Sequence, residues 1–244
     1  MLFTATREIG AKILRKTKDK VYLVGVFLYN SNDNIKERKD WMDYIEVDGM
    51  ELDGQELVSN ARVYNLGNAV RGSKFPMAID DKKPTEEIVK RTRVLGQAKP
   101  GSGHDCFLKG ILVVFDLTWT VKASVELQRY HFIDFVSSQS AMHRISKFDL
   151  DRQYIKYVDP RIIEIMKEKQ AEYNENPTPE KYLELLYSNP CGFQLTAEMT
   201  TNYLQLKTIY NQRKNHRLPE WVAFCEWCET LPYFKELVLG ENEN

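Results

Sequence analysis

The stretch Lys122–Arg144, KASVELQRYHFIDFVSSQSAMHR, is the densest cluster of polar side chains in this 244-residue sequence. Lys122, Glu126 and Arg129 follow one another at i, i+4 and i+7, which predicts a charged stripe along one face of a helix. Taken alone, such a stripe is typical of a solvent-exposed helix face with ordinary ion pairs.

The residues after this helix change that interpretation, because so many of their side chains can donate or accept hydrogen bonds. They are Tyr130, His131, Asp134, Ser137, Ser138, Gln139, Ser140, His143 and Arg144. An arginine fork beside hydroxyl groups suits the binding of a phosphate or of the edge of a pyrimidine ring. The stretch is therefore a candidate site for a small phosphorylated ligand.

The segment before this stretch predicts a strand and a second candidate residue. Phe107–Phe115 is a hydrophobic run of strand length, and Thr118 can cap the helix that runs to about Arg129. His104 follows a Gly-Ser-Gly segment and precedes the strand, where loops commonly carry functional groups. A single histidine is more often structural or simply exposed, so its role depends on its neighbours.

The first hundred residues predict short elements separated by loops. Lys20–Tyr29 is β-branched and aromatic, which indicates a strand, and the polar residues 30–40 indicate a loop. Residues 53–63 predict a short helix capped by Asp53. Residues 69–83, with glycine, serine and proline, indicate a mobile loop, and residues 84–96 predict a helix that opens on Pro-Thr-Glu-Glu and ends at a glycine.

The C-terminal half predicts mainly helices. Asp159-Pro160 and Thr178-Pro179 are helix starts, and Asn189-Pro190 is a stop. Residues 195–214 and 219–230 complete the predicted helices. A few strands among many helices, without strict alternation, indicate one α+β domain.

Asn202 and Arg213 are a further candidate pair on the helix predicted for residues 195–214. They are eleven residues apart, and at 100° per residue this spacing returns them to within about 20° of each other on the helix surface. The alternative is an unrelated surface asparagine and surface arginine, which spacing alone does not reject.

Composition and charge exclude several classes of protein. The chain is 43% hydrophobic and 28% charged, which excludes a protein that is entirely disordered, collagen-like or a disulfide scaffold. Its 34 basic and 35 acidic residues give a net charge of −1, which argues against binding to polymeric nucleic acid. The longest purely aliphatic or aromatic run, Ile111–Phe115, is too short to cross a membrane, so we expect a cytoplasmic protein.

The four cysteines, Cys106, Cys191, Cys225 and Cys228, suit a reducing compartment better than a disulfide framework. Cys225 and Cys228 form a single CxxC pair without a second pair at zinc spacing, inside an aromatic helical stretch. We therefore predict buried helix thiols there and no metal site.

Several segments in a fixed order resemble the flavin-dependent thymidylate synthases, or ThyX family. The resemblance spans roughly Tyr44 to Leu237, and Arg129 follows His104 by the 25 residues that the family spacing requires. The first matching segment is Asn60-Ala61-Arg62-Val63, which stands where the family has a helix ending in Ala-Arg-Val. The other matching segments are Gly103-His104, then Arg129 with Ser138-Gln139-Ser140, and then Asn202 with Arg213 to Trp221.

This resemblance implies a single ThyX-like domain over residues 44–240, with a twisted, mainly antiparallel sheet flanked by helices and a helical C-terminal half. Residues 1–43 would be an N-terminal extension of uncertain packing. The family implies a homotetramer with sites between subunits, FAD as bound cofactor, NADPH and methylenetetrahydrofolate as cosubstrates, and conversion of dUMP to dTMP. It needs no cysteine nucleophile, which agrees with the absence of a Pro-Cys-His setting in this sequence.

The resemblance also implies roles for individual residues. The catalytic residues would be Arg129 and Arg213. The residues that bind the nucleotide would be Glu126, Arg129, Ser138, Ser140 and Arg213. The residues that bind the flavin would be His104, Cys106, Arg129, His131, Asn202 and Thr208.

Several positions depart from the family pattern and leave alternatives open. The family Arg-His-Arg is Arg129-Tyr130-His131 here, its helix Gln is Glu126, its motif Ser is Asp134 and its Glu is Ser138. Carboxylates suit the amino group of cytosine, so one alternative is a divergent, phage-type enzyme that acts on dCMP or makes a hydroxymethylated product. A second is a non-catalytic homologue that binds nucleotide or flavin, and a third is an α+β protein whose polar stretch is merely surface.

Overall fold

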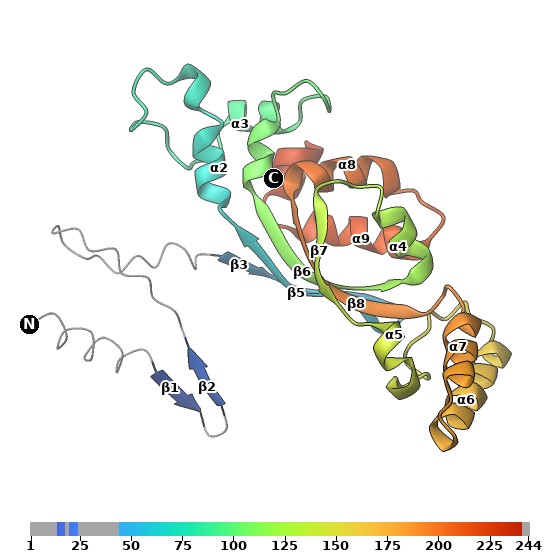
Figure 1. The fold of residues 1–244 in the computed structure, drawn as a ribbon. Coiled ribbons are helices and arrows are strands. Elements are labelled where there is room, and N and C mark those ends of the chain that lie inside the picture. Colours follow the sequence, from blue (N-terminus) through green and yellow to red (C-terminus); the bar gives the residue numbers. More distant parts are fainter. Residues whose placement is uncertain (1–13, 18–19, 24–43, 241–244) are drawn as a thin grey trace, which may run out of the picture. The chain divides into compact units, whose positions relative to one another are not determined.

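The computed structural model describes residues 14–17, 20–23 and 44–240 (Figure 1). The chain divides into residues 1–42 and 43–244, which are treated separately. In the first, β1 (Leu14–Thr17) and β2 (Lys20–Leu23) pair antiparallel. The strand predicted for Lys20–Tyr29 is confirmed over Lys20–Leu23; its remaining residues, and the loop predicted for residues 30–40, lie outside the described residues.

An antiparallel sheet organises residues 44–240. Its strands run in the order β3-β5-β6-β8-β7, and β4 pairs with β5 (Figure 1). Their bounds are β3 Tyr44–Val47, β4 Met50–Leu52, β5 Gln55–Tyr64, β6 Leu112–Thr120, β7 Ile133–Ser138 and β8 Gln194–Asn202. The longest ladder joins β6 to β8, from Leu112 opposite Asn202 to Thr120 opposite Gln194. The predicted α+β class and mainly antiparallel sheet are confirmed.

A tight hairpin replaces the helix predicted for residues 53–63, so that prediction is wrong. Asp53 and Gly54 join β4 to β5 and have φ angles of 56° and 77°. Positive φ at both central residues is the geometry of the two-residue Asp-Gly hairpin turn, which matches the twist of paired strands. Asn60-Ala61-Arg62-Val63, compared above with a helix end, accordingly lies in β5.

The helix predicted for residues 195–214 begins only at Tyr203, because Gln194–Asn202 form β8. Ala197, Met199 and Thr201 are buried and the residues between them are not, which is the period of two of a strand. Leucine, alanine, glutamate and methionine favour helices and obscured this alternation in the sequence.

The helix starts predicted at Pro160 and Pro179 are confirmed. Helix α6 (Pro160–Glu175) begins after Asp159, whose side chain accepts a hydrogen bond from the Arg161 amide, and α7 (Pro179–Ser188) begins after Thr178 in the same way. Helix α9 (Pro219–Thr230) has the predicted bounds. The remaining helices of this half are α5 Ala141–Arg144, the 3-10 turn η4 Ile145–Lys147, α8 Tyr203–Arg213 and the π-helix η5 Lys235–Leu239.

Residues 66–110 differ from the prediction in several boundaries. Helix α2 (Leu66–Gly72) and the 3-10 turn η2 (Phe75–Met77) occupy much of the predicted loop at 69–83. Helix α3 is Lys90–Gly96, so the helix predicted for residues 84–96 starts late but ends where expected. The 3-10 turn η3 (Cys106–Gly110) takes the first half of the strand predicted for Phe107–Phe115.

The β6-to-α4 boundary is also later than predicted. Thr118 is still inside β6, where its hydroxyl lies 2.9 Å from that of Thr196 across the ladder. The residue that caps α4 (Val121–Leu127) is Thr120, whose hydroxyl accepts from the Ala123 amide at 3.1 Å and donates to Glu220 at 2.6 Å. Helix α4 is thereby fixed to the start of α9.

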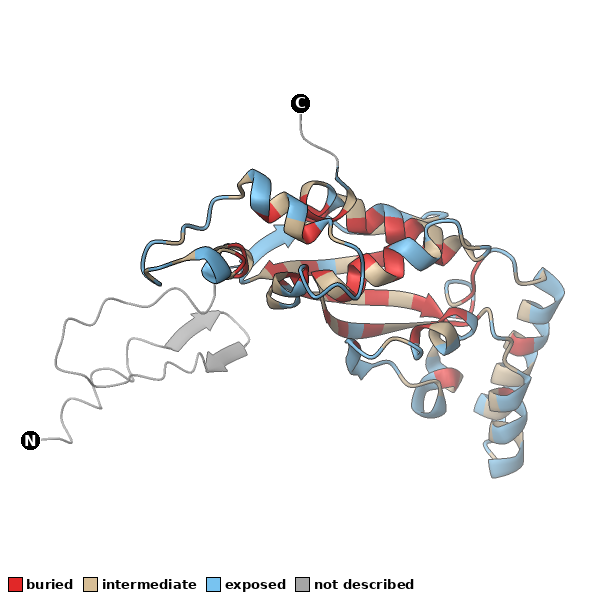
Figure 2. Ribbon diagram, turned by 90° about the horizontal axis from the view of Figure 1, so that it is seen from above, coloured by how far each residue is buried: buried red, intermediate tan, exposed pale blue. Residues whose placement is uncertain are grey.

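Helices α8 and α9 cover one face of the sheet and enclose the main core (Figures 1 and 2). The rings of Phe115 and Trp227 are 4.9 Å apart, and those of Trp119 and Trp221 meet edge to face at 4.9 Å. Cys225 and Cys228 are buried in α9, which confirms the prediction of buried helix thiols. No helix among the described residues has the length and apolar character needed to span a membrane.

A buried ion pair joins the loop after α3 to α8. The Lys207 ammonium donates to the Asp105 carboxylate at 2.7 Å, and the two side chains are only 4% and 3% exposed. The same ammonium donates to the carbonyl oxygens of Gly96 and Ala98 at 2.8 and 2.6 Å. With all three donors used, the desolvated charge is fully compensated.

The close approach of α3 to η5 yields a stability prediction. A Cβ on Gly96 would collide with the backbone carbonyl of Leu237, whereas a Cβ on Gly72, the last residue of α2, meets nothing. We expect Gly96→Ala to destabilise the protein by about 1–3 kcal/mol through overpacking, and Gly72→Ala to be neutral or stabilising by up to about 1 kcal/mol. Urea unfolding of both variants checks this, and equal effects would contradict the packing described.

Candidate active site

A cavity of about 330 Å3 lies where the segment after α4 faces α8. Its eight lining residues are Arg129, Tyr130, His131 and Phe132 from that segment, and Gln205, Thr208, Gln212 and Arg213 from α8. The cavity thus combines two guanidinium groups, an imidazole and two amides with aromatic surface. Such a mixture can bind a phosphorylated ring compound through both its charge and its ring.

Helix α8 presents one face to the cavity because Gln205, Thr208 and Gln212 recur at i, i+3 and i+7. Asn202 directly precedes the helix, and its side-chain oxygen accepts from the Gln205 amide at 3.0 Å. Asn202 is therefore the N-cap of α8, and Arg213 is its last residue. The two do not share a helix face as predicted, because Asn202 still belongs to β8.

Arg213 is held by neighbours from α4, from the segment after α4 and from α9. Its Nη1 donates to Glu126 of α4 at 2.9 Å, and its Nε donates to the Tyr130 hydroxyl at 2.8 Å. The guanidinium carbon lies 4.9 Å from the ring centre of Trp221 in α9. Tyr130 in turn donates to Gln212 at 3.0 Å. This arrangement fixes the orientation of a guanidinium whose side chain is only 12% exposed.

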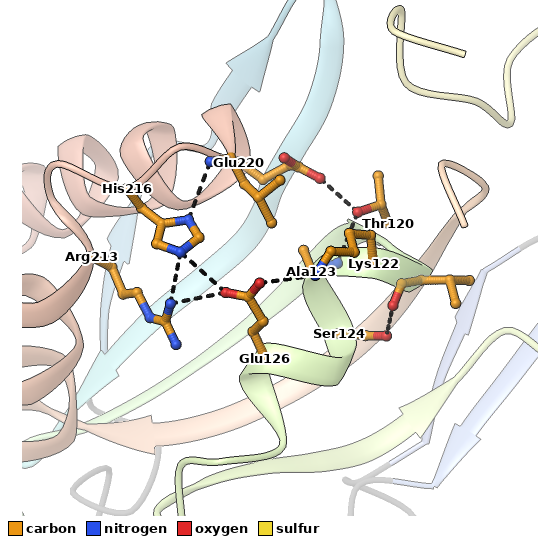
Figure 3. A network of polar contacts seen from close by, with 10 residues as sticks. Thr120, Lys122, Ala123, Ser124, Glu126, Arg213, His216 and Glu220 are labelled. Atoms are coloured by element: carbon orange, nitrogen blue, oxygen red, sulfur yellow. Dashed lines mark hydrogen bonds and ion pairs between the residues drawn. The ribbon is translucent and has the colours of Figure 1, made fainter. Parts of the chain in front are cut away.

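Glu126 is the centre of the charged contacts (Figure 3). One carboxylate oxygen accepts from Lys122 at 3.1 Å, and the other lies 2.9 Å from Arg213 and 3.2 Å from Nε2 of His216. Partial burial disfavours its ionisation, but the hydrogen bond from Lys122 and the charges of His216, Lys122 and Arg213 prevail and lower its pKa. The carboxylate is therefore ionised at neutral pH.

His216 joins this cluster through both ring nitrogens. Its Nδ1 accepts from the Leu218 amide at 3.2 Å. Its Nε2 lies 2.8 Å from Nη1 of Arg213 and 3.2 Å from the Glu126 carboxylate oxygen that Arg213 contacts.

Only some of the residues predicted for the site come together. Arg129, His131, Thr208 and Arg213 line the cavity, and Glu126 reaches it through Arg213. The others lie elsewhere: His104 is exposed in the turn before η3, Cys106 is exposed at its start, Asn202 caps α8, Ser138 ends β7, and Ser140 precedes α5. Ser138 instead lines a second cavity of about 160 Å3 beside α4.

The sequence analysis did not single out Phe132, Gln205 and Gln212, which line the cavity. Gln205 and Gln212 are seven residues apart on α8, and both lie inside the helix predicted for residues 195–214, so their shared face could have been found from the sequence. Tyr130 entered the analysis as a departure from a motif, and the structure shows it as a contact of Arg213.

The cysteines do not supply a nucleophile to this site. Burial raises the pKa of the Cys225 thiol to about 12 and that of Cys228 well above its usual range. Cys106 and Cys191 are exposed and do not line the cavity. No group of three or more potential metal-ligating side chains occurs in the part of the chain that the structure describes.

Comparisons with known proteins identify the fold. No protein-family model and no curated protein matches the sequence. Among solved structures, two of flavin-dependent thymidylate synthase ThyX from Helicobacter pylori with FAD and dUMP match over 72% of this chain, at 13% identity, with TM-scores of 0.54 and 0.58. The match covers 94% and 93% of those chains. This chain has the fold of the flavin-dependent thymidylate synthases.

A further structure with this ThyX-like fold is the UMP/dUMP methylase PolB from Streptomyces cacaoi, bound with 5-Br dUMP. It matches at 15% identity over 75% of this chain and 94% of that chain, with a TM-score of 0.54. The resemblance seen in the sequence is thus confirmed at the level of the fold. The cavity, with Arg129 and Arg213 on its walls, is the candidate site within it.

The lowered pKa of Glu126 predicts a pH-dependent contribution to stability. A carboxyl group whose pKa is depressed by folding stabilises the protein above its ordinary pKa of 4.5, and loses that contribution as the pH falls through the folded value. We expect Glu126→Gln to lower the free energy of unfolding by at most about 1 kcal/mol at neutral pH, and by less well below pH 4.

Urea unfolding at the two pH values measures the difference between wild type and variant. Glu226→Gln, an exposed position on α9, controls for the change in total charge. A difference of the same size at both pH values would show that the variant acts through packing and not through the charge of Glu126.

Proposed function

We propose that this protein is a flavin-dependent enzyme that transfers a one-carbon unit from methylenetetrahydrofolate to carbon 5 of a pyrimidine deoxynucleotide, in the simplest case dUMP to dTMP, with NADPH as reductant. The observation that carries the proposal is a fixed guanidinium, Arg213, at the wall of a cavity in a ThyX-like fold. FAD would supply the redox and carbon-transfer chemistry. The chain's residues would bind and orient the nucleotide and exclude water.

The donor groups of the cavity fit such ligands. Arg129 and His131 provide donors for phosphate oxygens, while Arg213 and Gln212 provide donors for ring carbonyls. The volume, about 330 Å3, is at the small end for ligand sites, which run from about 300 to 1,000 Å3. It suits one mononucleotide-sized group. A nucleotide together with FAD would need a larger binding surface, which another subunit can supply.

The geometry favours uracil over cytosine as the base. The cytosine alternative depends on Glu126 as an acceptor for the amino group, but both of its oxygens are already engaged, one by Lys122 and the other by Arg213 and His216. The donors Arg213 and Gln212 suit the two carbonyl groups of uracil. We therefore propose dUMP as the substrate, with dCMP as the comparison in the test below.

An exposed apolar surface supports the proposed homotetramer. It comprises Val121 and Val125 of α4 together with Phe132, Phe135 and Val136 in and before β7. Val121 and Phe135 both line the second cavity, so the helix and strand portions are contiguous. Among the described strands β7 pairs only with β8, which leaves an open sheet edge beside this surface. A second subunit would cover both.

The thiols support a cytoplasmic location. All four cysteines are free, and Cys106 and Cys191 are exposed, which suits a reducing environment. We therefore propose a cytoplasmic enzyme.

The activity test uses purified protein reconstituted with FAD. We expect a flavin absorbance spectrum, and release of the C5 hydrogen of dUMP when methylenetetrahydrofolate and NADPH are added. Arg213→Ala should reduce turnover by about 100-fold or more, because it removes a fixed hydrogen-bond donor at the ring. Arg161→Ala, at the exposed start of α6, should retain activity.

Two results would contradict the proposal. A colourless protein that gains no flavin on reconstitution would exclude flavin chemistry. Flavin binding without turnover of dUMP or dCMP would identify a non-catalytic homologue.

The oligomer test compares two valines of equal exposure on helices. Val125 on α4 is 57% exposed and Val94 on α3 is 58% exposed. We expect wild type and Val94→Lys to sediment as tetramers and Val125→Lys to dissociate, because a buried unpaired ammonium is costly. A monomeric wild type, or dissociation of both variants, would contradict the assignment of this surface.

A further inference from the structure

The charge of Arg213 is compensated before any ligand arrives. Its Nη1 lies 2.9 Å from a carboxylate oxygen of Glu126, and both side chains are largely buried, at 12% and 15% exposure. At this depth the two opposite charges are poorly screened by water and act on a ligand together. A ligand in the cavity therefore encounters Arg213 as one member of an ion pair with Glu126.

The guanidinium still has donors to offer. Nε donates to the Tyr130 hydroxyl and Nη1 donates to Glu126, while Nη2 has no acceptor among the described residues. Figure 3 shows this second terminal nitrogen directed away from His216. A neutral carbonyl oxygen can accept from Nη2 without needing a net positive charge behind it.

Besides Glu126, the groups around Arg213 that are named here include one further charged side chain, that of Lys122. Helix α4 contributes Glu126 and Lys122, the latter 54% exposed and itself bound to Glu126. The segment after α4 contributes Tyr130, the turn after α8 contributes His216, whose Nε2 lies 2.8 Å from Nη1 of Arg213, and α9 contributes the uncharged Trp221 ring. Because solvent screens the Lys122 ammonium, the nearest fixed charge to the guanidinium is the Glu126 carboxylate.

The other arginine of the cavity is different. Arg129 is exposed and has no carboxylate partner among the described residues. It keeps its full positive charge, as the binding of a phosphate requires. The two arginines thus suit different parts of a nucleotide, Arg129 the phosphate and Arg213 the uncharged ring.

We propose that Glu126 is a specificity-determining residue that neutralises Arg213, so that the cavity binds a pyrimidine ring in its neutral form and disfavours the ring ionised at N3. The proposal rests on the proposed function, since it requires a pyrimidine nucleotide in this cavity. Glu126 acts through Arg213 and does not itself contact the ring. With a neutral side chain at position 126, the unpaired guanidinium would attract the anionic ring instead.

The test uses a ring that ionises and one that does not. Bromine at carbon 5 makes the N3 proton of dUMP more acidic, so raising the pH from about 7 to about 9 makes much of 5-bromo-dUMP anionic at the ring. Cytosine has no N3 proton to lose, and dCMP carries the same phosphate. The ratio of the two dissociation constants, measured by calorimetry with FAD present, therefore reports the ring charge alone.

For wild type we expect the ratio of the 5-bromo-dUMP to the dCMP dissociation constant to rise about threefold or more between these pH values, a change of the size that one partly buried charge produces. Glu126→Gln should keep the ratio flat or make it fall. Glu126→Asp, which keeps the charge, and Glu226→Gln, which changes an exposed charge elsewhere, should behave as wild type.

Each remaining outcome decides the matter. A flat or falling ratio in the wild type, which needs no variant, overturns the inference and leaves the proposed function standing. The same rise in Glu126→Gln as in wild type also overturns it, because the preference would then come from the N3 proton as a donor. If neither nucleotide binds to wild type with FAD present, the proposed function fails and the inference fails with it.

Discussion

The ladder between β6 and β8 is the constraint on which the rest of the structure depends. It pairs nine residues of each strand, and hydrogen bonds from Val121 to Phe193 and from Tyr203 to Ile111 continue it at both ends. Because the strands are antiparallel, α4 leaves one end of the ladder and α8 leaves the other. The two helices run back over the same face, and Glu126 meets Arg213 where they converge.

This convergence explains how residues far apart in the sequence form one site. Thr120 caps α4 and Asn202 caps α8, and these two residues also end the ladder. A slip of the pairing by one residue would turn alternate side chains to the opposite face and displace both caps. The position of Arg213 is therefore set by the register of the sheet as much as by its own contacts.

The sequence predicted the elements that carry local signals. Prolines after Asp159, Thr178 and Leu218 marked three helix starts correctly, because proline has the backbone angle of the first helical turn and this preference is local. Residues 53–63 and 195–202 were predicted as helices because their composition suits both states. What decides in favour of strands is pairing with β6, a contact with residues up to 90 positions away that no local pattern records.

The residues of the candidate cavity were predicted in part. Glu126 and Arg129 follow a helical spacing, His131 lies in the polar stretch after them, and Arg213 was assigned through the family resemblance. The contact of Tyr130 with Arg213, and the engagement of both Glu126 oxygens, depend on how α4 crosses α8 and were not visible in the sequence.

The helical hairpin between β7 and β8 has a consequence for the order of folding. Strand β8 can pair only after residues 139–193 have closed into a loop, and the entropy lost in closing grows with the length of flexible chain. Lys169 pairs with Glu184 across α6 and α7, and Tyr154 bridges to Phe193 beside β8, so local structure spans most of that distance. The hairpin thereby shortens the chain that has to be closed, and brings the last central strand to the sheet sooner.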